Sequence, residues 1–243
     1  MNYYKSDLAY IHDDGFGQFA KAAAHTLVAE LQSNQLLEGT VLDLGCGSGT
    51  AAQIFSNYGY QVIGLDISKD FIRIARERVP EGTFHVRSFV GTELPACVGV
   101  CAIGEVLNYK FDEESNDITR RKLFENVFSA LRPGGLFLFD IAGPDRTPED
   151  KKRSFIEHQD WTVLTEVSAE GKILTRKITT FIRVGELYRR RKETHQLQLI
   201  SPNSIKRQLE SCGFFVKRIR EYEETPLLSG LHGFKAFKTL QAV

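Results

Sequence analysis

Apolar residues recur along this chain with two different spacings, and the change between them divides the sequence into two kinds of structure. In residues 16–32 they return every three or four positions, which predicts an amphipathic helix with one buried face. Residues 40–44 form a short apolar run followed by glycines, which is typical of a buried strand. Strand-like and helix-like segments then alternate up to residue 141. We expect further strands at 61–66, 83–89, 98–103 and 136–141, and helices at 51–58, 68–79 and 120–131.

The pattern changes after residue 142. Residues 143–153 are polar and contain two prolines, so we expect an exposed loop there. Three long stretches of strand-like sequence follow, and the turns between them favour two hairpins of an antiparallel sheet. A helix that starts at Ser201 and Pro202 and two final strands complete the chain. The three stretches are expected at 160–167, 172–183 and 187–199, the helix at 201–212, and the last strands at 214–220 and 234–240.

These elements predict a fold of the α/β class. Strands that alternate with helices over short connections are typical of a parallel sheet with helices on both faces. We therefore expect a three-layer, doubly wound, mostly parallel sheet of seven strands. A small antiparallel sheet is expected as an insertion after strand five, because a right-handed crossover cannot absorb three extended strands within the main sheet.

The amino-acid composition argues against several classes of protein and binding partner. The chain has 243 residues, with 31 Lys and Arg against 31 Asp and Glu. This balance argues against a general nucleic-acid coat or a polybasic membrane-surface protein, since both depend on a large positive field. No stretch approaches the ~18 consecutive apolar residues of a membrane span, and residues 1–14 do not resemble a signal peptide. The four cysteines contain no Cys-x-x-Cys pair, so we expect a reduced, cytoplasmic protein without membrane association or bound metal.

The glycine-rich turn after the first strand carries the most specific chemistry. The sequence Asp43-Leu-Gly-Cys-Gly-Ser-Gly49 places glycines where the backbone must turn tightly and approach a ligand closely. The helix that follows offers unpaired N–H groups to polar ligand atoms. A dinucleotide fingerprint starting at Gly45 would need a third glycine at position 50, which is Thr50. This spacing disfavours a nicotinamide-dependent oxidoreductase.

The same turn resembles the first motif of class I S-adenosylmethionine-dependent methyltransferases. Asp66 lies about 20 residues after Gly45 and resembles that family's ribose-binding acid. The turn Leu131-Arg-Pro-Gly-Gly135 is similar to the one before the family's fifth strand. The resemblance implies S-adenosylmethionine as cofactor and one methyltransferase domain over residues 1–243. That domain would comprise an N-terminal lid and helix (1–35), a Rossmann-like core (36–145 and 200–243) and an antiparallel insertion on the substrate side (150–200).

The resemblance also implies which residues contact the cofactor. Where the family often has an acid that holds the adenine amino group, this chain has Ser88 and Phe89, which favours a hydroxyl or backbone contact with apolar packing. Glu105 is expected near the methionine end of the cofactor; the alternative is an acid in a first helical turn that interacts with the helix dipole. The expected cofactor residues are Asp43, Gly45, Cys46, Gly47, Gly49, Asp66, Ile67, Ser88, Phe89, Ile103, Gly104 and Glu105.

The sequence contains fewer motifs that indicate the methyl acceptor than motifs that indicate the cofactor. Aromatic residues interleave with polar ones in residues 2–16, as in a segment that folds over the cofactor as a lid; the alternative is a terminus that covers core surface. The turn after the fourth strand lacks the Asn/Asp-Pro-Pro-Tyr/Phe motif of nucleic-acid amino-methyltransferases and the Pro-Cys of cytosine carbon methyltransferases. We therefore expect in-line transfer to a small-molecule N or O nucleophile. The candidate bases are His12, Tyr109, Asp140 and His195.

A run of positive charge at residues 189–192 keeps two other functions open. Strand alternation puts Arg189, Arg191, Glu193 and His195 on one face of the last long stretch. Such a run is usually a solvated sheet face, and its functional alternative is a surface that binds an acidic acceptor or RNA phosphate. An RNA-directed methyltransferase and a non-catalytic protein that binds the cofactor are thus the alternatives. The sequence does not indicate an oligomeric state.

Overall fold

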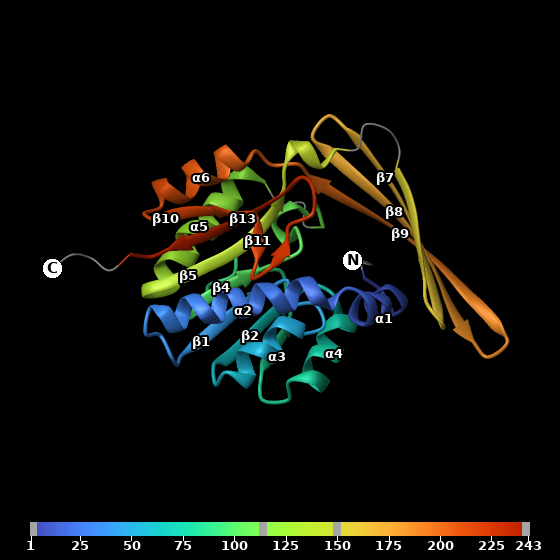
Figure 1. The fold of residues 1–243 in the computed structure, drawn as a ribbon, viewed down its shortest axis with the longest axis horizontal. Helices are drawn as coiled ribbons and strands as arrows, with labels where there is room; N and C mark the ends of the chain where they lie inside the picture. The colour runs from blue at the N-terminus through green and yellow to red at the C-terminus, as the bar shows by residue number, and fades with distance from the viewer. Residues whose placement is uncertain (1–3, 112–115, 148–151, 240–243) are drawn as a thin grey trace.

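The computed structural model describes residues 4–111, 116–147 and 152–239, and its centre is a seven-stranded sheet (Figure 1). The strands are β1 (Thr40–Leu44), β2 (Gln61–Asp66), β3 (Thr83–Val86), β4 (Cys97–Ala102), β5 (Leu131–Ala142), β10 (Phe215–Ile219) and β13 (Leu231–Phe237). Their order is β10-β13-β5-β4-β1-β2-β3, and only β13 runs antiparallel to its neighbours. The predicted seven-stranded, mostly parallel sheet is confirmed. Residue 240, the end of the last predicted strand, lies outside the described residues.

Helices cover both faces of this sheet, which gives the predicted three layers (Figure 1). One face carries α2 (Gly17–Ser33), α3 (Thr50–Asn57) and α4 (Lys69–Arg78), and the other carries α5 (Asp117–Ala130) and α6 (Pro202–Ser211). Helix α4 illustrates how local sequence determines where a helix begins and which face it buries. The Ser68 hydroxyl accepts a hydrogen bond from the Phe71 amide at 3.2 Å and caps the helix, while Phe71 and Ile72 are buried on its inner face.

The inserted antiparallel sheet has four strands, and it extends beyond the body of the molecule (Figure 1). They are β6 (Lys152–Glu157), β7 (Trp161–Glu170), β8 (Ile173–Val184) and β9 (Leu187–Gln198). The prediction of three strands was wrong by one, because the start of β6 fell in the segment predicted to be a loop. All six residues of this edge strand are exposed, so it has no buried face that would produce a clear alternation. Residues 148–151 of the predicted loop lie outside the described residues.

The N-terminal segment contains a helix that the sequence pattern did not predict, α1 (Ser6–Gly15). Its buried face combines Leu8 and Ile11 with a carboxylate, Asp7, which interrupts the apolar stripe. Phe16 has a non-helical φ of −128° and separates α1 from α2. Residues 1–3 of the predicted lid lie outside the described residues. The division of the chain into lid, core and insertion at the expected boundaries stays a prediction.

The topology brings the predicted cofactor residues to one edge of the sheet. The glycine turn follows β1, Asp66 ends β2, and Gly104 follows β4, so all three lie at the carboxyl ends of parallel strands, where open α/β sheets bind ligands. Short elements complete the chain: the 3-10 turns η1 (Val106–Asn108) and η2 (Pro144–Arg146), and a hairpin of β11 (Glu221–Tyr222) and β12 (Thr225–Pro226). Within the described ranges, no helix is both long and apolar enough to cross a membrane. The expected cytoplasmic location stays a prediction.

Candidate active site

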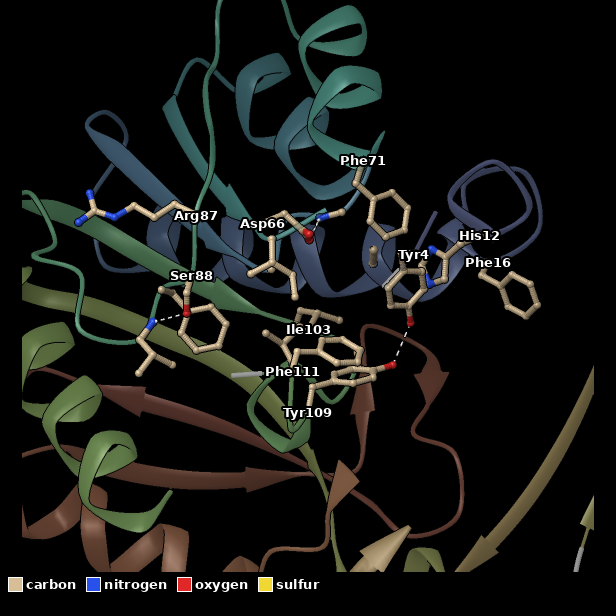
Figure 2. Close-up of a pocket in the computed structure, with 18 of the residues that line it drawn as sticks. Tyr4, His12, Phe16, Asp66, Phe71, Arg87, Ser88, Ile103, Tyr109 and Phe111 are labelled. Atoms are coloured by element: carbon tan, nitrogen blue, oxygen red, sulfur yellow. Dashed lines mark hydrogen bonds between the residues drawn. The ribbon is translucent and has the colours of Figure 1, made fainter. Parts of the chain in front are cut away.

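An elongated cavity of about 190 Å³ lies beyond the carboxyl ends of β1, β2, β3 and β4, and α1 and the start of α2 line part of it. Figure 2 shows its long axis. Ser88 lies at one end, Asp66 and Ile103 lie near the middle, and an aromatic group that includes Tyr4 and Tyr109 lies at the other end. The cavity therefore has distinct ends joined by the residues that follow the central strands.

The glycine turn approaches the cavity through its backbone. Gly45 has φ +73°, and a Cβ there would come within 2.6 Å of the Val106 side chain. Gly47 has φ +51° and no protein atom within 4 Å of the place a Cβ would take, so its cavity side is open to a ligand. The amide groups of Gly45 and Cys46 both donate to the Leu65 carbonyl, at 2.7 and 3.0 Å, which fixes the turn against the end of β2.

Asp66 joins the glycine turn to the start of α4. Its carboxylate accepts hydrogen bonds from the Gly47 amide at 3.0 Å and the Ser68 amide at 2.7 Å. Burial raises the pKa of Asp66 to about 6, and the two amide groups oppose that shift. The carboxylate is thus ionised at neutral pH, and it faces the middle of the cavity.

Asp43 supplies a second negative group beneath the glycine turn. It is 4% exposed, and its Oδ2 has no hydrogen-bond partner in the structure. Burial and then the charge of Asp66 raise the pKa of Asp43 to about 7. A buried carboxylate oxygen without a donor favours a ligand that brings positive charge or hydrogen-bond donors. S-adenosylmethionine carries ribose hydroxyls that can donate hydrogen bonds, so the ionised Asp66 and the open side of Gly47, which both line the cavity, fit it.

Eight of the twelve expected cofactor residues line the cavity, and four do not. Those that line it are Gly45, Gly47, Asp66, Ile67, Ser88, Phe89, Ile103 and Gly104. Asp43, Cys46 and Gly49 lie outside the lining. Glu105 requires a correction: its buried carboxylate pairs with Arg176 at 2.6 Å and Arg146 at 3.1 Å, so its charge is neutralised within the protein. With φ +63°, Glu105 holds the loop after β4 instead of facing a ligand.

The opposite end of the cavity is aromatic, and the Arg176–Glu105 ion pair lies next to its two tyrosines. The Tyr4 and Tyr109 hydroxyls are hydrogen-bonded to each other at 2.8 Å, and Tyr109 stacks on Phe111 with ring centroids 4.3 Å apart (Figure 2). Burial raises the pKa of both tyrosines, so both stay protonated at neutral pH. Burial lowers the pKa of His12 to about 4, so its imidazole is neutral there.

Two of the four candidate bases do not face the cavity. Both oxygens of the fully buried Asp140 accept hydrogen bonds: Oδ1 from the Glu105 amide at 2.6 Å, and Oδ2 from the Gly104 amide at 3.0 Å and the Tyr222 hydroxyl at 3.1 Å. We therefore correct its assignment from base to a residue that holds the loop after β4. His195 is also fully buried, with Nε2 3.0 Å from Glu193, and lies behind the Tyr4 ring. His12 and Tyr109 remain the candidates that contact an acceptor.

Several lining residues were missing from the expected site. Tyr4 and Phe16 belonged to the aromatic segment singled out as a lid, and Phe71 lies in the helix expected at 68–79. Helical periodicity places Phe71 inward, but it does not distinguish a core from a cavity wall. No sequence signal identified the others, which are Phe19, Ala20, Arg87, Val90, Val106 and Phe111.

Comparisons with known proteins agree with this geometry. A family model described as "Methyltransferase domain" matches residues 41–135. The chain is 27% identical to the putative methyltransferase YqeM of Bacillus subtilis (strain 168), over 75% of this chain and 76% of that protein. It is 31% identical to a probable 18S rRNA (guanine-N(7))-methyltransferase of Dictyostelium discoideum, over 39% of this chain and 35% of that protein.

Solved structures extend the likeness in fold to nearly the whole chain. An S-adenosylmethionine-dependent methyltransferase from Clostridium acetobutylicum ATCC 824 superposes with a TM-score of 0.82 at 17% identity, covering 98% of this chain and 100% of that one. The sugar N-methyltransferase KedS8 from Streptoalloteichus sp ATCC 53650 gives 0.77 at 14% identity, covering 99% and 96%. With the glycine turn, Asp66 and the sheet order, these findings show a methyltransferase domain over residues 41–135 and the fold of S-adenosylmethionine-dependent methyltransferases.

Proposed function

We propose that this enzyme methylates a nitrogen atom of a small molecule bound at the aromatic end of the cavity. The observation that carries the proposal is the chemistry of that end, where aromatic rings surround the uncharged His12 imidazole and the Tyr4–Tyr109 hydroxyl pair, and the nearby Arg176 is paired with Glu105. Transfer to an alcohol needs a base strong enough to take the hydroxyl proton, and the neutral His12 and Tyr109 are weak bases. An uncharged amine needs no such base, because its own lone pair is the nucleophile.

The cofactor residues are proposed to act chiefly by orientation. When bound, S-adenosylmethionine supplies an electrophilic methyl group on a positively charged sulfur. Asp66 would accept hydrogen bonds from the ribose hydroxyls in the middle of the cavity, and the Gly47 backbone lies close enough to fit against the cofactor. Ser88 and Phe89 would then hold the adenine at the far end. This order places the methyl group towards Gly104 and the aromatic end.

The acceptor residues are proposed to align the amine and exclude water. The amine nitrogen would attack in line, and its bond to the methyl carbon would form as the carbon–sulfur bond breaks, with the electron pair of that bond left on sulfur. The nitrogen then loses its extra proton, and the His12 imidazole or the Tyr4–Tyr109 hydroxyl pair can pass it towards solvent. Holding nucleophile, carbon and sulfur collinear is a contribution of up to ~7–11 kcal/mol.

The size and cover of the site favour a small acceptor over RNA. A cavity of about 190 Å³, lined in part by α1 and the start of α2, would admit at most a single base of an RNA acceptor. The sugar N-methyltransferase shares the fold over 99% of this chain, including the inserted sheet, whereas the match to the rRNA methyltransferase spans 39%. Methylation of RNA is the alternative, and transfer of a labelled methyl group distinguishes the two acceptors.

Incubation of the enzyme with methyl-labelled S-adenosylmethionine and a cell extract tests the acceptor class. Label should enter the low-molecular-weight fraction and remain both after alkaline treatment that cleaves methyl esters and after hydriodic acid treatment that cleaves methyl ethers, because an N-methyl group resists both. Asp66→Ala should lower the labelling at limiting cofactor. Label recovered in RNA or protein, with none in small molecules, would refute the proposed acceptor.

Substitution of Asp66 tests the cofactor site. Asp66→Ala should weaken binding of S-adenosylhomocysteine by about 1.5–3 kcal/mol, the usual loss for hydrogen bonds to a charged group, which is roughly tenfold to a hundredfold in Kd. Isothermal titration gives the value directly. Asp160→Ala, which removes an exposed carboxylate between β6 and β7, is the control and should bind normally. If the two variants bind S-adenosylhomocysteine with equal affinity, Asp66 does not contribute to the cofactor site.

Cofactor affinity should also depend on pH. Because the pKa of Asp66 is raised to about 6, the carboxylate gains a proton as the pH falls below that value and loses its capacity as a full acceptor. The Kd of S-adenosylhomocysteine should therefore rise as the pH falls below about 6, towards the roughly tenfold to hundredfold loss expected of Asp66→Ala. Asp66→Asn cannot titrate and should bind weakly without this trend. A steep trend that persists in Asp66→Asn would contradict the assignment.

A further inference from the structure

Helix α1 packs against the inserted sheet through both apolar and charged contacts. Leu8 and Ile11 form one buried cluster with Trp161 and Val163 of β7. Asp7, 2% exposed, receives two hydrogen bonds from the Arg189 guanidinium, at 2.6 and 2.9 Å, and lies 3.0 Å from Arg191. Two arginines at these distances offset the cost of burying the carboxylate. One face of the positive run at residues 189–192 is therefore the surface on which α1 docks.

Glu193 continues that face of β9 and holds the chain just before α1. Its carboxylate accepts hydrogen bonds from the backbone amides of Tyr4 at 2.8 Å and Lys5 at 3.0 Å. Its side chain is 5% exposed and also lies 3.0 Å from the His195 ring. Amides before the first helical turn have no partner within the helix, so an external carboxylate is a strong acceptor for them. These contacts stabilise Tyr4 at φ +47°, a conformation unfavourable for a tyrosine.

The backbone position fixed by Glu193 determines where the Tyr4 ring lies. That ring packs on His195 at 4.8 Å, on Phe71 at 5.0 Å and on His12 at 5.5 Å between centroids, and its hydroxyl meets Tyr109. Figure 2 shows it beside the aromatic end of the cavity. The Tyr4 carbonyl accepts from the Ser68 hydroxyl at 2.9 Å. Tyr4 thus lies where the inserted sheet, the end of β2 and the acceptor end meet.

We infer that Glu193 is a positioning residue: with the Asp7–Arg189–Arg191 contact, it holds Tyr4 over the acceptor end, so that the inserted sheet sets the enzyme's affinity for its acceptor. The inference rests on the proposed function, since it takes the aromatic end as the acceptor site. Glu193 itself does not line the cavity, and the Asp66 contacts do not involve β9. Loss of Glu193 therefore acts on the acceptor and leaves the cofactor site intact.

The test compares Glu193→Ala with Lys192→Ala, the neighbouring exposed residue on the opposite face of β9. The probe is labelled S-adenosylmethionine at saturation, with the low-molecular-weight fraction of a cell extract titrated by dilution. Glu193→Ala should raise the amount of fraction needed for half-maximal labelling by about tenfold or more, with the Kd of S-adenosylhomocysteine within about twofold. Glu193→Gln, which keeps an acceptor oxygen, should recover part of the loss. Equal behaviour of the two alanine variants, or a parallel loss of S-adenosylhomocysteine binding, would overturn the inference.

Trp161, the chain's single tryptophan, gives a readout that needs no acceptor. It is buried against α1, and its indole donates to Asp14 at 2.8 Å. Acrylamide should quench its fluorescence more strongly, by about twofold, in Glu193→Ala and in Asp7→Asn than in the wild type or Lys192→Ala. If the wild-type enzyme labels nothing in the small-molecule fraction, the proposed function fails. Unchanged quenching in both variants would instead overturn the docking role of Glu193.

Discussion

The interaction on which the site depends is the carboxylate of Asp66 accepting hydrogen bonds from Gly47 and Ser68. It holds the glycine turn against the end of β2 and keeps a buried negative charge at the middle of the cavity. Ser68 then caps α4 and donates its hydroxyl to the Tyr4 carbonyl. One buried carboxylate thus organises the backbone around the cofactor position and links it, through a single serine, to the segment over the acceptor end.

The two ends of the cavity are built by different parts of the chain. Strand ends of the central sheet supply the cofactor side, and this is the part that the family model matches. The proposed acceptor end depends on α1, whose position is set by the buried ion pairs to β9 and the apolar contacts to β7. Because α1 contacts β7 and β9 as well as Arg78 and Phe71 of α4, the inserted sheet contributes to the site without lining the cavity.

The sequence predicted features whose causes are local. The sheet, the glycine turn and the position of Asp66 follow from periodicity and short motifs. It failed where a residue's partner is distant in the chain. Asp140 looked like an active-site acid, but Tyr222 and the Gly104 amide occupy its oxygens, and Glu105 is neutralised by Arg176 from the insertion. Neither pairing has a signature in spacing, since it depends on how two sheets meet.

The central claim is that the cofactor lies along the cavity with its methyl group at the aromatic end. The most direct test is an NMR measurement on the enzyme with S-adenosylmethionine labelled with ¹³C at the transferable methyl. The account predicts an upfield methyl resonance, shifted by nearby ring currents, with cross-peaks to ring protons of Tyr4, Tyr109 or Phe111 and none to Phe89. A methyl resonance at the free-solution position, or cross-peaks to Phe89 instead, would contradict this orientation.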